Sequence, residues 1–174
     1  MFATFADRLD YPMLAVTARV ESSADGAAGE ADGCLVGFAT QVSIDPSRHL
    51  VCLSKHNRTF ELALRTGALA VHLLTAGQRD LAELLGGHSG HDTEKLANLS
   101  WTIGPHGTAL LADCPTWFAG AIIATIDLGD HVGFLLSPLT GEDEQSSEED
   151  GQALTGSPLL TYQDVRALRP GRPA

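Results

Sequence analysis

Short apolar runs, separated by turn-forming residues, dominate the pattern of the chain. The runs are rich in Val, Ile, Leu and Ala, and each is bounded by Gly, Pro, Asp or Ser. This pattern is typical of β-strands joined by turns and loops. It predicts strands at Met13–Val20, Cys34–Ser43, Leu50–Leu53, Ala68–Leu74, Ala119–Asp127 and His131–Pro138.

Helix signals are confined to shorter segments between these strands. Asn57–Thr66 starts with a residue type that caps helices and is followed by Gly67, a type favoured just after a helix. Thr75–Gly86 opens with a Thr-x-x-Gln capping box and ends at glycine. Asp92–Asn98 is expected to add a further turn or two. The chain is therefore expected to be mainly β and to form a closed or partly closed barrel, because closure removes unpaired strand edges.

Two polar segments are expected to lie outside the core. Glu21–Asp32 is rich in Gly, Ala and acidic residues and is expected to join two hairpin strands. Glu142–Gly156 gathers acidic residues and has no apolar anchor before Ala153. A calcium-binding loop is one interpretation, but the spacing differs from that of a helix–loop–helix calcium site. A solvated, mobile acidic loop is therefore expected there.

Length and charge narrow the class of protein. The chain has 174 residues, which fits one domain spanning 1–174. Its 11 Lys and Arg against 22 Asp and Glu give a formal charge of −11, which argues against a nucleic-acid-binding surface. No apolar run reaches the roughly 18 residues of a membrane helix. The first residues lack the basic start and apolar stretch of a secretory signal, so a cytoplasmic protein is expected.

The cysteine and histidine spacing gives little support for a metal site. Cys34, Cys52 and Cys114 are an odd number without C-x-x-C spacing, and each has apolar neighbours. Buried, reduced thiols are therefore expected rather than disulfides or a zinc site. His88 and His91 suggest a metal-binding pair, but no third ligand is evident in the sequence, so a polar loop is expected there.

A cluster of hydrogen-bond donors follows the predicted strand Leu50–Leu53. It lies where that strand gives way to a helix start, whose N–H groups and dipole favour an anion. The cluster can hold a phosphate group, or it can cap the helix with basic residues facing solvent; taken alone, the second interpretation is the stronger. This donor cluster consists of Ser54, Lys55, Asn57, Arg58 and Thr59.

The triplet Gly129-Asp130-His131 separates two apolar runs. Glycine accepts positive φ and aspartate can bond its own backbone, so the triplet is typical of a strand-joining turn. His131 is also the one side chain in the triplet that can exchange a proton near neutral pH. A plain turn and a functional histidine are both compatible with the local pattern.

Several short motifs follow one another in a fixed order along most of the chain: Val42-Ser43-Ile44-Asp45-Pro46, Leu50-Val51-Cys52-Leu53, Leu69-Ala70-Val71-His72-Leu73-Leu74, Gln78-Arg79-Asp80-Leu81-Ala82, Gly129-Asp130-His131 and Pro158-Leu159-Leu160-Thr161-Tyr162. Each motif alone is weakly specific. Their shared order resembles the flavin reductase-like family, which consists of small split-barrel flavoproteins. Members of that family often act as the reductase component of two-component monooxygenases.

The resemblance implies a flavin cofactor, FMN or FAD, and NADH or NADPH as the reductant. It places the flavin phosphate at the donor cluster and the nicotinamide beside Asp130, His131 and Tyr162, with His131 in a positioning role. It also implies contacts with the flavin ring from one strand segment, from the strand before the donor cluster and from the loop after the second helix. These ring contacts are Val36, Gly37, Phe38, Ala39, Thr40, Leu53, Gly86, Gly87 and His88.

The chain departs from the family pattern at three places near this site. Gly37-Phe38-Ala39 stands where relatives commonly have Ser-Ser-Phe, so side-chain hydroxyls are lost and backbone contacts must replace them. His72 replaces the usual Asn, and Leu85 stands where an aromatic residue is common.

The sequence therefore predicts an FMN-binding split barrel that acts as an NAD(P)H-dependent flavin reductase. The flavin and nicotinamide carry the hydride chemistry, so proximity and stacking are expected from the protein rather than a nucleophile. A homodimer is implied because relatives complete the flavin pocket with a second chain, and a monooxygenase is an implied partner. The alternatives are an oxidoreductase that keeps FMN as a prosthetic group, and a flavin- or haem-binding module without turnover. No membrane, nucleic-acid or metal partner is expected.

Overall fold

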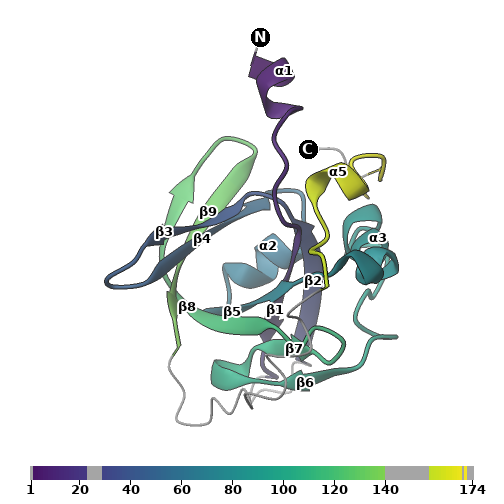
Figure 1. The fold of residues 1–174 in the computed structure, drawn as a ribbon. Coiled ribbons are helices and arrows are strands. Elements are labelled where there is room, and N and C mark those ends of the chain that lie inside the picture. Colours follow the sequence, from purple (N-terminus) through teal and green to yellow (C-terminus); the bar gives the residue numbers. More distant parts are fainter. Residues whose placement is uncertain (1, 23–28, 140–156, 170, 172–174) are drawn as a thin grey trace.

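The computed structural model describes residues 2–22, 29–139, 157–169 and 171. Most of the strands in these ranges belong to one curled β-sheet (Figure 1). Neighbouring strands of the sheet are antiparallel, in the order β2-β1-β5-β8-β9-β4-β3. Their bounds are β1 Leu14–Val20, β2 Glu30–Val36, β3 Ala39–Ser43, β4 Arg48–Ser54, β5 Ala68–Leu73, β8 Trp117–Asp127 and β9 His131–Pro138.

Short helices and one small hairpin surround this sheet. Figure 1 shows α1 projecting away from the barrel at the N-terminal end, and α3 and α5 lying together beside it. The helices are α1 Phe2–Ala6, α2 Arg58–Ala63, α3 Arg79–Gly87 and α5 Tyr162–Val165, with the 3₁₀ helices η1 Ala76–Gln78 and η2 Pro105–Gly107. The hairpin consists of β6 Trp101–Ile103 and β7 Ala109–Leu111.

The two edge strands of the large sheet are consecutive in the chain. β2 lies at one edge and β3 at the other, and only Gly37 and Phe38 separate them. So short a link joins opposite edges only if the sheet curls until they approach each other. Where the link passes β4, the Cys52 N–H donates to the Phe38 carbonyl oxygen at 2.9 Å. The prediction of a mainly β, partly closed barrel with short peripheral helices is confirmed.

The predicted strand Cys34–Ser43 is two strands in the structure. It breaks at Gly37, where the chain crosses from one sheet edge to the other and the Tyr11 ring packs against the backbone. β2 also begins earlier than predicted, at Glu30, which pairs with Val20 in a hairpin with β1. The hairpin expected around 21–32 is therefore confirmed, although its last residues belong to β2.

Alternating residues of β1 serve two separate cores. Leu14, Val16 and Ala18 point into the barrel, whereas Met13 and Ala15 pack into a second core shared with α3, the β6–β7 hairpin and the C-terminal segment. This division follows from the two-residue repeat of a strand, whose successive side chains point to opposite faces. One face of β1 therefore joins the barrel to α3, the β6–β7 hairpin and the C-terminal segment.

The sequence did not predict the β6–β7 hairpin, which a buried histidine holds in place. His72 Nδ1 lies 3.2 Å from the Ala15 carbonyl oxygen, and the Leu111 N–H donates to His72 Nε2 at 3.1 Å. Because a carbonyl can only accept, Nδ1 carries the hydrogen and the ring is neutral. Burial lowers the pKa of His72 to about 4, which agrees with this state. The histidine at the position of the usual Asn thus has a structural role.

The helices are shorter or differently divided than predicted. α2 ends at Ala63 with Leu64 as its C-cap, and Gly67 does not adopt the positive φ of a helix-terminating glycine, so that prediction was wrong. The Thr-x-x-Gln capping box is confirmed, but its first turn is the 3₁₀ helix η1, and α3 continues through Gly86 to Gly87. Residues 92–98 form turns rather than a helix.

The predictions for the cysteines, the acidic segment and membrane helices can each be compared with the described residues. Cys34 and Cys114 are buried free thiols as expected, whereas Cys52 is only partly buried. The acidic segment 142–156 lies outside the described residues. None of the helices in the described ranges has the length and apolar character that a membrane crossing requires.

Candidate functional site

The triplet at 129–131 forms the tight turn between β8 and β9. Gly129 has a φ of 106°, which favours glycine, and the Leu128 N–H donates to the His131 carbonyl oxygen at 2.9 Å. Asp127 accepts a hydrogen bond from the Gly129 N–H at 2.9 Å. The prediction of a strand-joining turn is confirmed. The turn also leaves the His131 side chain partly exposed at the rim of the barrel.

His131 is held by its neighbour in this turn. Its Nδ1 lies 2.9 Å from Asp130 Oδ1. The hydrogen bond from His131 lowers the pKa of the Asp130 carboxyl, so Asp130 is an acceptor at neutral pH. This contact fixes the orientation of the imidazole and leaves Nε2 as the ring nitrogen available to a ligand.

Lys55 ties the donor cluster to the same turn. Its N–H donates to the Asp130 carbonyl oxygen at 2.9 Å, and its Nζ donates to both carboxylate oxygens of Asp127, at 2.9 and 3.0 Å. In the sheet, Ser54 at the end of β4 pairs directly with His131 at the start of β9. The end of β4 and the β8–β9 turn therefore form one continuous surface.

A row of aromatic rings runs from His131 to the C-terminal segment. The His131 ring meets Phe38 edge-on with centroids 5.4 Å apart, and Phe38 lies 6.2 Å from Tyr11. Tyr11 in turn stacks on Tyr162 at 5.1 Å with an interplanar angle of 19°. Phe38 is 56% exposed, so the centre of the row offers a flat apolar face to solvent. The structure thus brings together three residues that the sequence singled out, and Tyr11 joins them.

Tyr11 explains why glycine stands at position 37. A Cβ at Gly37 would lie 2.5 Å from Tyr11 Cε2 and 3.3 Å from Met13 Sδ, and the first of these distances is closer than any side chain tolerates. The ring of Tyr11 therefore occupies the space that a serine side chain would need. Burial raises the pKa of the Tyr11 hydroxyl, and the nearby Tyr162 raises it further, so the phenol stays neutral.

Gly37→Ser is expected to reduce the free energy of unfolding by about 1–3 kcal/mol, the usual cost of forcing extra atoms into a packed site. Tyr11→Ala should remove the clash, so the loss caused by Gly37→Ser should be much smaller in a Tyr11→Ala background. Urea unfolding of the wild type, both single variants and the double variant measures this coupling. Strictly additive losses would show that Tyr11 does not set the residue at 37.

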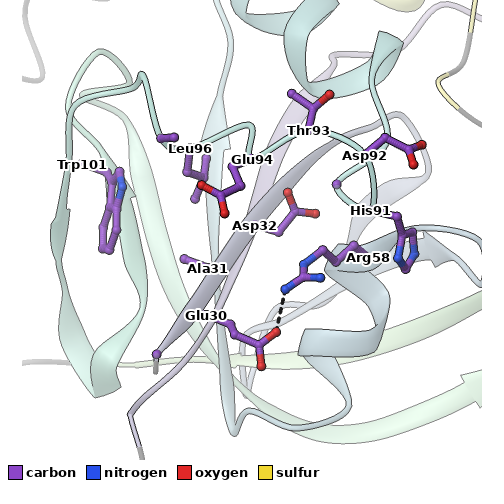
Figure 2. A pocket seen from close by; sticks show the side chains of 13 residues that line it. Glu30, Ala31, Asp32, Arg58, His91, Asp92, Thr93, Glu94, Leu96 and Trp101 are labelled. Atoms are coloured by element: carbon purple, nitrogen blue, oxygen red, sulfur yellow. Dashed lines mark hydrogen bonds and ion pairs between the residues drawn. The ribbon is translucent and has the colours of Figure 1, made fainter. Parts of the chain in front are cut away.

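Arg58 borders a second feature of the surface, a polar cavity of about 400 Å³. Figure 2 shows the Arg58 side chain reaching from α2 toward Glu30. Its Nη2 donates to Glu30 Oε2 at 2.6 Å, and Arg65 Nη2 lies 2.9 Å from the other oxygen. The hydrogen bond from Arg65 is the main cause that lowers the pKa of the Glu30 carboxyl. Arg58 is thus a partly exposed cation held at the rim of a cavity.

The side chains of the donor cluster point in different directions. Thr59 is fully buried, and its hydroxyl donates to Asp32 Oδ2 at 2.7 Å. Ser54 Oγ accepts from the His56 N–H at 3.3 Å, and Asn57 is the N-cap residue of α2 without a side-chain cap bond. The partly exposed cations Lys55 and Arg58 therefore lie at the surface of the cluster, and Thr59 lies beneath it.

The segments that the sequence assigned to the flavin ring differ in exposure. Val36 and Leu53 are buried in the barrel core, so only their backbone can reach a ligand. Ala39 and Thr40 lie at the start of the edge strand β3 and are more exposed. Gly87 ends α3 and His88 follows as its C-cap, while Gly86 packs against Leu35 of β2.

The remaining candidates do not form part of this surface. Leu85, at the position of a common aromatic residue, is buried in the second core. His91 lies 3.4 Å from Glu61, and Cys34 is a core thiol whose pKa burial raises to about 11. Within the described ranges, no three His, Cys, Asp or Glu side chains are grouped so as to hold a metal ion.

A family model described as "Flavin reductase like domain" matches residues 6–168. The chain belongs to the flavin reductase-like family. This confirms the resemblance inferred from the order of the motifs. The match covers the barrel, the β8–β9 turn and the segment that carries Tyr162, and it begins before Tyr11.

Known flavin reductase-like proteins show how far the likeness extends. A Rhizobium meliloti (strain 1021) protein named "Probable flavin reductase" is 31% identical over 151 residues, which cover 86% of this chain and 47% of that protein. A Rhodococcus jostii (strain RHA1) protein named "Flavin-dependent monooxygenase, reductase subunit HsaB" is 30% identical over 104 residues, covering 58% of this chain and 52% of that protein. The chain therefore spans about half the length of the curated relatives it matches.

A solved structure of a flavin reductase-like fold agrees with the barrel described above. The Streptomyces globisporus NADH:FAD oxidoreductase SgcE6 superposes with a TM-score of 0.68, covering 80% of this chain and 78% of that chain. The two sequences are 22% identical, so the superposition supports the fold alone.

Proposed function

We propose that this chain is an NAD(P)H-dependent flavin reductase that transfers a hydride from a nicotinamide to bound FMN or FAD. The observation that carries the proposal is the aromatic row of His131, Phe38, Tyr11 and Tyr162, which lies beside the donor cluster. Membership of the flavin reductase-like family supports the same assignment.

The exposed groups suit the two ends of a flavin. The ring needs a flat apolar surface with backbone donors and acceptors at its edge, which Phe38 and the adjoining residues Gly37, Ala39 and Thr40 supply. The phosphate needs cations, which Lys55 and Arg58 supply. Because both cations are already paired with carboxylates in this structure, phosphate binding exchanges those partners for a dianion.

The residues of the chain act by orientation and electrostatics. A flavin bound here would supply the acceptor for a hydride, and with it two electrons, from the reduced nicotinamide. His131, held by the Asp130 carboxylate, positions the nicotinamide through its remaining ring nitrogen. Tyr162, stacked on Tyr11, bounds the same space from the C-terminal side. Holding two reactants in contact in this way accounts for a large share of the barrier reduction in such reactions.

A homodimer is part of the proposal. The outer half of β8 is exposed on both faces and carries Ile123 and Ile126, which are 49% and 46% exposed, and Leu128 just beyond its end is 50% exposed. A strand that is apolar and uncovered on both faces is typical of a surface that another chain covers. We therefore expect a second copy to pack against the β8–β9 hairpin, next to His131. A monooxygenase that receives reduced flavin is a further proposed partner, in a cytoplasmic setting, and the name of the Rhodococcus jostii relative supports it.

Ile126→Lys is expected to split the dimer, because a charge placed in an apolar interface must be desolvated without a partner. Light scattering coupled to size-exclusion chromatography measures the mass, with Ile103→Lys as a control at another exposed isoleucine. A wild-type chain that elutes as a monomer would exclude this part of the proposal.

The proposed activity is tested by following NADH and NADPH oxidation with FMN, FAD and riboflavin as acceptors. Rapid turnover with free flavin in excess supports a reductase that releases its product. Turnover that requires a different acceptor would instead indicate a prosthetic FMN. Bound flavin without any nicotinamide oxidation would indicate a binding module.

A further inference from the structure

Three charged or polar side chains, one of which belongs to the donor cluster, form a buried group next to the exposed members of that cluster. Asp32, Thr59 and Lys95 are 2%, 0% and 3% exposed. Asp32 Oδ2 accepts the Thr59 hydroxyl hydrogen at 2.7 Å and lies 3.5 Å from Lys95 Nζ. We call these three residues the buried triad.

The triad joins three separate segments of the chain. Asp32 is on β2, Thr59 is in the first turn of α2, and Lys95 is in the turns that follow α3. The turn segment also packs directly on the carboxylate, because a Cβ at Gly90 would lie 2.5 Å from Asp32 Oδ2. The three segments therefore meet at the Asp32 carboxylate.

Burying this ion pair is costly for the fold. Removing a carboxylate and an ammonium from water costs several kcal/mol per ion, and well-packed apolar residues often give equal or greater stability. A buried ion pair therefore adds little to the free energy of unfolding. Its directional contacts can instead fix the relative positions of the segments that it joins. If the Asp32–Lys95 pair fixes geometry, the residues that it positions are those on the three joined segments.

The segments carry residues of the proposed phosphate site. Arg58 immediately precedes Thr59 in the first turn of α2, and Asn57 is the N-cap residue of that helix. Arg58 and Asp32 line the same cavity, together with Glu30 (Figure 2). Because the Thr59 hydroxyl donates its hydrogen bond to Asp32, that hydrogen is not available to an anion at the surface.

We propose that the buried triad positions the flavin-phosphate site, and that Thr59 acts through Asp32 rather than as a ligand of the phosphate. This inference rests on the proposed function, since it concerns the phosphate of the same flavin. Asp32 is paired with Lys95 and accepts a hydrogen bond from the Thr59 hydroxyl. This contact holds the first turn of α2, from which Arg58 extends.

The test is a thermodynamic cycle on FMN affinity. Thr59→Val removes the hydroxyl. Asp32→Leu with Lys95→Met removes both charges and the oxygen that accepts the Thr59 hydrogen, while keeping similar side-chain sizes and leaving no unpaired buried charge. Thr59→Val is expected to weaken FMN binding about tenfold. The paired variant Asp32→Leu/Lys95→Met should weaken it to a similar extent, and adding Thr59→Val to that pair should weaken it little further, because the groups act as one unit. Thr59→Ser, which keeps the hydroxyl, is expected to bind FMN nearly as the wild type does.

The outcomes separate the alternatives. If Thr59 touches the phosphate directly, Thr59→Val should cost the same factor in both backgrounds, which would overturn the proposal. If the triad serves stability only, the variants should melt at lower temperature yet bind FMN like the wild type while folded, which would also overturn it. In turnover assays, the proposal expects a higher KM for FMN with little change in kcat. A wild-type protein that binds FMN without oxidising NADH or NADPH counts against the proposed function alone, and the affinity cycle is still decisive for the triad.

Discussion

Arg58→Ala is expected to weaken FMN binding by about 1.5–3 kcal/mol and to leave riboflavin binding nearly unchanged. This is the range for a charge-assisted hydrogen bond between a guanidinium and a phosphate. Riboflavin lacks the phosphate but keeps the ring, so it isolates the contribution of the anion site. Titration of both ligands by flavin fluorescence measures the difference.

Arg65→Ala is the matched control for this change. Arg65 follows α2 and also pairs with Glu30, but it lies outside the donor cluster and is more exposed than Arg58. Its removal should leave FMN affinity within a factor of about two, in keeping with the small contribution of exposed ion pairs. Equal losses of FMN and riboflavin in Arg58→Ala would contradict the assignment of Arg58 to the phosphate.

The second large effect concerns the β8–β9 turn. Asparagine tolerates turn conformations and stays polar, so His131→Asn should be nearly silent if the triplet is only a turn. If His131 positions the nicotinamide, the same change should lower kcat/KM for NADH or NADPH tenfold or more, or about 1.4 kcal/mol of transition-state binding. Flavin affinity should be largely preserved, because the donor cluster is untouched. Steady-state kinetics at saturating flavin measures both quantities.

A pH series extends this experiment. If a protonated imidazole attracts the nicotinamide dinucleotide, the wild-type KM for the nicotinamide should rise from acidic to alkaline pH. The Asn variant should lack this rise. His106→Asn serves as a control, since His106 has a φ of 52° in η2, a conformation that asparagine also accepts. Wild-type kinetics for His131→Asn throughout the series would reduce the triplet to a turn.

Local patterns predict the strands well because short-range rules govern them. The capping box at Thr75 and the turn at Gly129 are set by residues within a few positions, and both are evident from sequence. The break at Gly37 is not, because it depends on curling of the whole sheet and on the distant Tyr11 ring.

The candidate site was only partly predictable for the same reason. Phe38, His131 and Tyr162 could be named from motifs, but Tyr11 lies just before the first strand and carries no motif of its own. From the sequence alone, the five side chains of the donor cluster are equivalent candidates, because each carries a hydrogen-bond donor. Only the packing of α2 on β2 shows that Thr59 faces inward to Asp32 while Arg58 faces the cavity.

The proposed function requires that this chain bring a reduced nicotinamide and a flavin together for hydride transfer. Its most direct test is anaerobic mixing of the FMN-loaded protein with NADH and, separately, NADPH, while the visible absorbance of the flavin is followed. We expect full bleaching at one equivalent of at least one nicotinamide per flavin, slowed when the transferred hydrogen at C4 is replaced by deuterium. Flavin that stays bound and oxidised in the presence of both nicotinamides would contradict the proposed function.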